Sequence, residues 1–131
     1  MQPSDFTAIH TYTRAQAISD GMLIDITPMA TEAGIALPTV VSANLYHGHV
    51  VPPTNTLDLG QSIEGRLWDV LMVLRAYGKR AEGNRITFPV DIVAGRTPEG
   101  APRVVTVKVI AMVHPSDDAE PVITIMLPED E

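Results

Sequence analysis

Two histidines that flank a single glycine are the first side chains whose type and spacing suggest chemistry. If His47-Gly48-His49 formed part of a β-strand, both imidazoles would lie on the same face. Imidazole nitrogens bind zinc, copper and nickel, which makes His47 and His49 candidate metal ligands. On a helix the same spacing separates the two side chains, and the nearest downstream carboxylate is Asp58. We therefore expect solvated histidines and no bound metal or other cofactor.

A second pattern, near the start of the chain, suggests binding of a nicotinamide dinucleotide. His10 and Arg14 precede a short helix, Gly21 and the apolar pair Met22-Leu23. This order resembles the first strand and helix of ADP-ribosyltransferase-like domains, in which a polar residue on the strand contacts the dinucleotide. The resemblance implies a small dinucleotide-using enzyme with His10 and Arg14 as ligand candidates. The structural alternative is a helix cap, supplied by Thr13, that follows a strand.

Other signatures of catalysis or cation binding are missing from the sequence. The run Asp117-Asp118-Ala119-Glu120 groups oxygen ligands that calcium would accept, yet it lacks the spacing of an EF-hand loop, so we expect a solvated turn. Phosphate-binding glycine loops, a His-Glu-x-x-His zinc motif and a Gly-x-Ser-x-Gly elbow are absent. These absences favour a non-enzymatic protein over an enzyme.

Composition and charge limit the classes of partner. The 131 residues carry a net charge of −7, although eight of the nine Lys and Arg residues lie between positions 66 and 116. An acidic chain is repelled by phosphate backbones, which argues against nucleic acid as a partner. The chain has no cysteine and no apolar run near the ~20 residues that span a bilayer. With no signal-peptide pattern at the N-terminus, we expect a cytoplasmic protein without membrane contact.

The candidate residues are expected to lie in a single domain, residues 1–131, with an α+β fold. Its predicted elements are short N-terminal helices, one long amphipathic helix, and then a three- to four-stranded, mainly antiparallel sheet. Between Pro38 and Val51 a helix and a strand compete, since Thr39-Val40-Val41 favours a strand; we predict a helix. The remaining helices are predicted at 13–20, 27–34 and 61–79, and the strands at 22–26, 85–94, 103–113 and 121–127. Pro89 predicts that its strand lies at an edge of the sheet or carries a bulge.

The long helix has an apolar face that is wider than one stripe. Trp68 and Met72 form a second stripe beside the main one, so Trp68 belongs either to the core or to an interface. The main stripe consists of Ile63, Leu67, Val70, Leu71 and Leu74.

The last strand is apolar on both faces, which predicts that each face is covered. Ile123, Ile125 and Leu127 share one face, and one helix covers only one side of a sheet. We therefore take these residues, with Trp68, as interface candidates of a homodimer that forms through this strand or the long helix. The acidic tail, 129–131, would lie at the rim of that contact. The competing explanation is a monomer in which the short helices close the second face.

Three segments resemble an uncharacterised family of small bacterial proteins, a domain of unknown function often encoded on plasmids, phages and other mobile elements. They are 12–21 (YTRAQAISDG), 65–71 (GRLWDVL) and 120–128 (EPVITIMLP). The resemblance implies an accessory protein of a mobile element and transfers no catalytic residue. Together with the missing enzyme motifs, it favours a protein-binding function, such as inhibition of a host defence complex.

Overall fold

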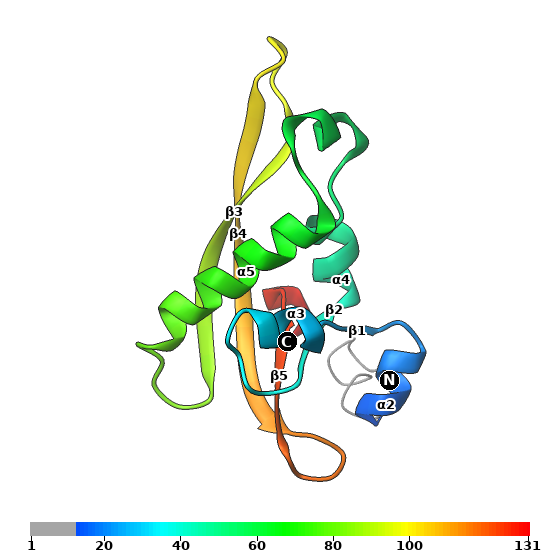
Figure 1. Cartoon of the computed structure of the whole chain (residues 1–131), viewed down its shortest axis with the longest axis vertical. Helices are drawn as coiled ribbons and strands as arrows, with labels where there is room; N and C mark the ends of the chain where they lie inside the picture. Colours follow the sequence, from blue (N-terminus) through cyan, green and yellow to red (C-terminus); the bar gives the residue numbers. More distant parts are fainter. Residues whose placement is uncertain (1–12) are drawn as a thin grey trace.

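A five-stranded sheet with helices packed on it forms the fold, in a computed structural model that describes residues 13–131 (Figure 1). The strands are β1 (Leu23–Asp25), β2 (Thr39–Ser42), β3 (Arg85–Arg96), β4 (Pro102–Pro115) and β5 (Pro121–Met126). The α-helices are α2 (Arg14–Ser19), α3 (Thr27–Glu32), α4 (Ala43–Leu45) and α5 (Ile63–Gly78). A π-helical turn, η1 (Tyr46–Val50), and two 3-10 turns, η2 (Thr54–Leu59) and η3 (Pro128–Asp130), complete the described chain.

The strand order β1-β2-β5-β4-β3 places the last strand at the centre of the sheet. β5 pairs in parallel with β2 and antiparallel with β4, and the other neighbours are antiparallel. A central strand is covered on both faces, which explains why residues 122–127 are all buried. The α+β class and the mainly antiparallel sheet are as expected, whereas the sheet has five strands instead of three or four.

The extra strand is β2, so the prediction of a helix over 38–51 is wrong for residues 39–42, whereas residues 43–50 are helical. Thr39, Val40, Val41 and Ser42 are buried, and Val40 and Val41 pair with Thr124 and Ile125 of β5. Stiff β-branched side chains pack well on a pleated surface that is covered on both sides. The helix begins only after Ser42, whose hydroxyl accepts a hydrogen bond from the Leu45 amide at 3.2 Å and so caps α4.

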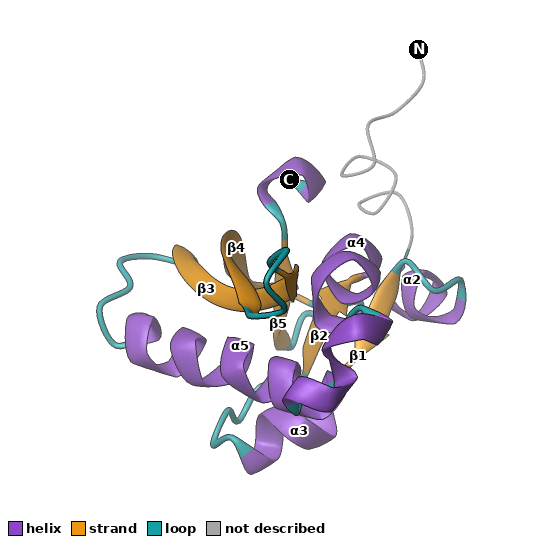
Figure 2. Cartoon of the chain, turned by 90° about the horizontal axis from the view of Figure 1, so that it is seen from above, coloured by secondary structure: helices purple, strands orange, loops and turns teal. Residues whose placement is uncertain are grey.

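Helix α5 lies across the sheet and covers one of its faces, together with α3 (Figure 2). Its buried stripe packs against β3 residues such as Phe88 and Val90, and the C-terminal turn η3 lies on the opposite side of the sheet. α2 packs through Ala17 against Leu23 and Val40, which supplies part of the second layer that a monomer needs. No helix in residues 13–131 is both long and apolar enough to cross a membrane.

Strand β3 forms one edge of the sheet, as Pro89 predicted. The carbonyl of Asn84 accepts a hydrogen bond from the Val113 amide at 2.8 Å, so even-numbered positions of this strand bond to β4. Odd-numbered positions therefore direct their backbone groups away from the sheet, and Pro89 removes one amide donor from the middle of that free edge. A bulge between Val93 and Gly95 bends the strand further along.

Candidate binding site

A half-open groove of about 350 Å³ lies where the C-terminal end of α5 meets the sheet. Its walls are the last turn of α5, the segment that follows it and the loop after α3, while β3, β4 and β5 form the floor. The lining residues are Ile35, Leu74, Arg75, Gly78, Ala81, Gly83, Asn84, Arg85, Ile86, Ala111, Val113 and Ile123.

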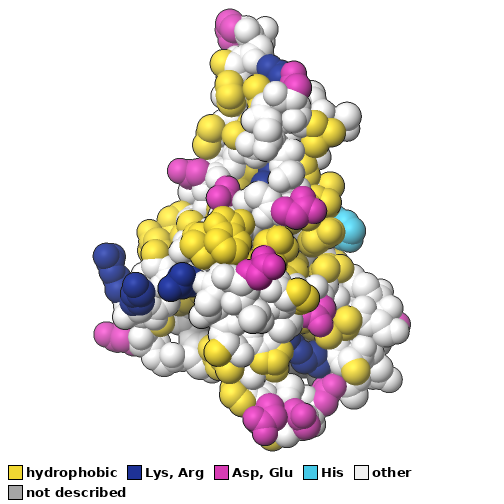
Figure 3. Space-filling view, viewed as in Figure 1, with side chains coloured by type: hydrophobic (Ala, Val, Ile, Leu, Met, Phe, Trp, Pro, Cys, Tyr) yellow, Lys and Arg dark blue, Asp and Glu magenta, His cyan; other side chains and the backbone are white. Residues whose placement is uncertain are grey.

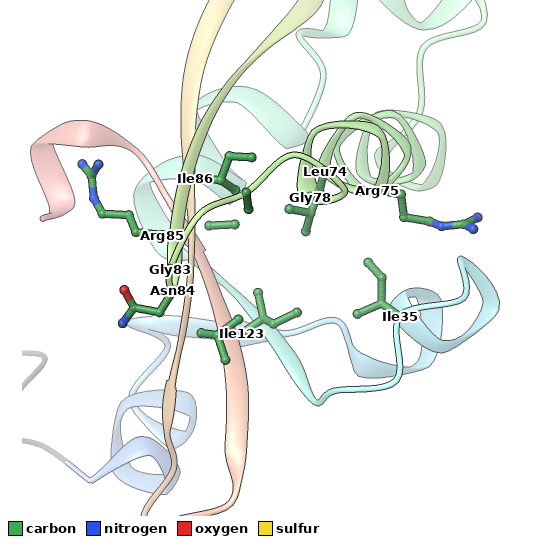
Figure 4. Close-up of a pocket in the computed structure, with 12 residues that line it drawn as sticks. Ile35, Leu74, Arg75, Gly78, Gly83, Asn84, Arg85, Ile86 and Ile123 are labelled. Atoms are coloured by element: carbon green, nitrogen blue, oxygen red, sulfur yellow. The ribbon is translucent and has the colours of Figure 1, made fainter.

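Aliphatic side chains surround the open space of this groove. Figure 4 shows that Ile35, Leu74, Ile86 and Ile123 approach it from four different segments of the chain. Gly78 ends α5 without a side chain, and a Cβ atom built on it would meet no heavy atom within 4 Å. The space is thus kept open by a glycine at a position where the backbone would accept any residue.

Arg75 stands at the rim with its guanidinium turned away from the groove, over the backbone of Gly34 (Figure 4). The Cζ atom of Arg75 lies 3.5 Å from where a Cβ of Gly34 would be, and Gly34 has a φ of +87°, so a larger residue there would be strained. Within residues 13–131, Arg75 has no hydrogen-bond or ion-pair partner. Lys79 and Arg80 are also unpaired there, and cationic side chains gather at this end of α5 (Figure 3).

A partly exposed strip of α5, whose middle residue Met72 is half-buried, leads to this rim. Trp68, Met72 and Arg75 follow one another at spacings of four and three residues, so they lie on one side of the helix. We call these three residues the α5 flank. Trp68 is 39% exposed, and Figure 3 shows apolar side chains gathered on the surface over α5. The structure therefore places Trp68 at the surface instead of in the core.

The other three interface candidates lie inside the fold. Ile123, Ile125 and Leu127 are buried in the core cluster beneath α5, and of these Ile123 reaches the groove. Their burial within one chain removes the physical motive for a dimer through the last strand. Of the tail residues 129–131, which were expected at the rim of a dimer contact, Asp130 is buried, whereas Glu129 and Glu131 are exposed and Glu131 pairs with Arg85.

His47 and His49 lie in the π-helical turn η1, where residues two apart project to different sides of the helix axis. The described residues contain no group of three His, Cys, Asp or Glu side chains that could hold a metal ion. The backbone carbonyl of His49 instead accepts a hydrogen bond at 2.8 Å from Arg66, a buried arginine of α5. Arg66 also donates to the carbonyl of Val93 and to Gln61, so it ties η1, β3 and α5 together, while its burial lowers the pKa of its guanidinium.

Arg14 begins α2, and the acidic turn between β4 and β5 reaches it. The carboxylate of Asp117 accepts hydrogen bonds from the Arg14 and Ala15 amides at 2.8 and 3.2 Å. Burial lowers the pKa of the Arg14 guanidinium, against the opposing charges of Asp25 and Asp117, and its buried Nη1 atom has no hydrogen-bond partner within residues 13–131. Asp117 thus caps α2 from an exposed turn, in agreement with the expectation of a solvated turn at residues 117–120. His10 lies outside the described residues, and Arg14 does not line the groove.

Sequence reasoning missed most residues of the groove. Leu74 and Arg75 belong to the predicted helix, but no local pattern connects them to Ile35 or Ile86, which the fold brings to the same space. The one signal available was the cluster of Arg75, Lys79 and Arg80 at the end of the helix, which is followed by a single acidic residue, Glu82, in the next ten positions.

Fold and site together define an α+β domain with an apolar groove at the basic end of its long helix. The chain belongs to a family of unknown function (DUF6573), whose model matches residues 4–131. Neither the curated proteins nor the solved structures contain a match to this chain.

Proposed function

We propose that this domain is a non-enzymatic protein-binding module and that the α5 flank is its contact surface. The observation that carries the proposal is the 39% exposure of Trp68 on a helix whose opposite face is fully engaged with the core. Tryptophan is the residue type that most often dominates binding energy at protein interfaces. A tryptophan that is 39% exposed on the surface of a helix is therefore a good anchor for a partner.

The neighbours of Trp68 suit the same task. Met72 has a flexible, polarisable side chain that adapts to different apolar surfaces. Arg75 adds an unpaired positive charge at the end of the strip, and Lys79 and Arg80 extend that charge. The partner surface is thus apolar opposite Trp68 and acidic opposite Arg75, because complementary charges steer association and fix the register.

The partner is a protein of the host cell, if the chain is a cytoplasmic accessory protein of a mobile element, as its resemblance to that family implies. Inhibition of a host defence complex is one form of this function. A nucleic-acid mimic would present carboxylates at its contact, whereas the α5 flank ends in three cations. The charge at the flank therefore favours a direct protein contact over occupation of a basic nucleic-acid channel.

Affinity capture from a lysate of the organism that encodes the chain tests this function. We expect a partner at close to one copy per bait, and a loss of at least about 30-fold in its affinity for Trp68→Ala. Val104→Ala is the matched control, because Val104 is an exposed apolar residue on β4, away from α5. Failure to recover a reproducible partner, or equal capture by both variants, would contradict the proposal.

If the partner is a second copy of this chain, the α5 flank forms a homodimer contact. Light scattering of the pure chain decides the matter, because the monomer mass is 14.1 kDa. A doubled mass that returns to 14.1 kDa in Trp68→Ala would make a second copy the partner. A mass of 14.1 kDa at all concentrations would leave a different protein as the partner.

The alternative function, a small dinucleotide-using enzyme, has Arg14 as its only described ligand candidate. The observation in its favour is the buried Nη1 atom of Arg14, which has no hydrogen-bond partner among the described residues. Two carboxylates, Asp25 and Asp117, already act on that guanidinium and would repel a pyrophosphate. A thermal-shift measurement with NAD tests it, since ligand at 100 times its Kd adds about 2.7 kcal/mol of stability; an unchanged Tm would exclude the enzyme reading.

A further inference from the structure

We propose that the groove at the end of α5 binds a small carboxylic acid whose compact hydrocarbon body lies among the aliphatic side chains and whose carboxylate meets Arg75. Arg75 belongs both to the α5 flank and to the rim of the groove, but Trp68 and Met72 do not line the groove, so ligand binding and protein binding are tested separately. The proposal rests on the shape and lining of the groove and on one unpaired cation at its rim.

The hydrocarbon part follows from the lining. Ile35, Leu74, Ile86 and Ile123 offer only methyl and methylene groups to the space, and Ala111 adds another methyl from the floor. A volume of about 350 Å³ is at the small end of the range for ligand pockets, so the ligand is compact. Burial of its apolar surface against these side chains would drive binding.

The carboxylate follows from the charges at the rim. Two arginines line the groove, and Arg85 is engaged by Glu131, so Arg75 is the lining cation left without a partner in residues 13–131. A guanidinium matches a carboxylate with two parallel hydrogen bonds. The side chain of Arg75 is exposed and its guanidinium lies over Gly34, so the proposed contact requires a rotation of the side chain that brings its head to the mouth of the groove.

The helix dipole opposes an anion at this position, because α5 ends at Gly78 and its C-terminus carries about half a negative charge. Arg75, Lys79 and Arg80 place three full positive charges within the same two turns. The sum is positive, so the local potential favours a carboxylate over a neutral or cationic head group.

Methyl NMR of the Ile- and Leu-labelled full chain tests the proposal directly, with 4-phenylbutyrate and its neutral analogue 4-phenylbutanol as probes. We expect saturable shifts of the Ile35, Leu74, Ile86 and Ile123 methyls with the acid. Ile92 and Ile110, which do not line the groove, are internal controls and should stay in place. The alcohol should bind the same methyls about fivefold more weakly, which is the size of one solvent-exposed charge contact.

Two substitutions test whether the methyl shifts arise from binding in the groove and from the charge of Arg75. Gly78→Leu fills the groove and should abolish the shifts by both probes, and the open space around Gly78 lets the fold accept the side chain, which the unshifted control methyls verify. Arg75→Gln should make the acid and the alcohol bind equally. Three results would overturn the proposal: methyl shifts that do not saturate, shifts that persist in Gly78→Leu, or equal affinities of both probes for the unmodified chain. These results are independent of the effect of Trp68→Ala on protein capture.

Discussion

The hydroxyl of Ser42 donates a buried hydrogen bond of 2.7 Å to the carboxylate of Asp130, across 88 positions of the sequence. Asp130 also accepts from the side-chain amide of Asn44 at 2.7 Å and from the Leu127 amide at 3.0 Å. Ser42 is the cap of α4 at the end of β2, so the bond joins the last turn of the chain to the strand next to β5. The acidic tail is therefore part of the fold.

Asp130→Ala is expected to destabilise the domain by about 2–3 kcal/mol. The substitution leaves two buried donors, the Ser42 hydroxyl and the Leu127 amide, without their acceptor, and an unsatisfied buried donor costs more than the hydrogen bond itself contributes. Urea unfolding followed by circular dichroism measures the change. Glu129→Ala, in the same turn but exposed, should stay within about 0.5 kcal/mol of the unmodified chain. Equal stability of the two variants would refute the role of Asp130.

Arg66→Met is expected to cost about 3 kcal/mol and to loosen the π-helical turn. Arg66 is 5% exposed, and its guanidinium donates to the half-buried carbonyls of His49 and Val93, which would lose this donor after the substitution. Hydrogen exchange should accelerate at residues 46–50 as well. Arg80→Met, at an exposed and unpaired arginine, is the control that should leave both readouts unchanged.

Pro89→Thr is expected to promote self-association of the folded domain. The substitution returns an outward amide donor to the free edge of β3 and completes a row of groups that can pair with a second strand. Light scattering against concentration measures the effect. Lys108→Thr, at the residue that pairs with Pro89 from β4, changes the same face without changing the edge. Self-association of Lys108→Thr to the same extent would show that surface charge, and not the edge, controls it.

The ion pair between Arg85 and Glu131 sets the direction of one pH effect. The hydrogen bond from Arg85 lowers the pKa of Glu131 below its ordinary value of 4.5. A carboxyl whose pKa falls on folding stabilises the fold above its unfolded pKa, and this contribution disappears as the pH falls through the folded value. Carboxyl NMR of the folded chain should show the pKa of Glu131 rise in Arg85→Gln; an unchanged midpoint would mean that the pair does not persist in solution.

The sequence was sufficient for elements whose signals are local. The predicted helix over 61–79 matches α5 at Ile63–Gly78, because its apolar stripe has helical spacing and Ser62 accepts a hydrogen bond from the Gly65 amide as its cap. The same holds for α2, where Thr13 and Gln16 form a capping box as the Thr13 cap implied. Strand β4, with its alternating valines, is equally local in its signal.

The incorrect predictions concern residues whose structure depends on partners that lie far away in the sequence. Strand β2 has no alternation because both of its faces are buried, and the partner that makes it a strand, β5, lies about 80 residues later. The tail looked solvated because Ser42 and Asp130 are far apart in sequence. The groove is the same case, since Ile35 and Ile86 meet only after the sheet and α5 have assembled.

The most direct test of the central claim is the fluorescence of Trp68, the single tryptophan of the chain, during titration with the partner captured from lysate. A half-exposed indole that becomes an interface anchor loses water contact, so we predict a saturable blue shift of its emission at the bait-to-partner ratio found by capture. Trp68→Phe, which keeps an aromatic ring and removes the signal, should bind the same partner more weakly by calorimetry. Binding of the partner with no change in Trp68 emission and equal affinity for Trp68→Phe would contradict the assignment of the α5 flank.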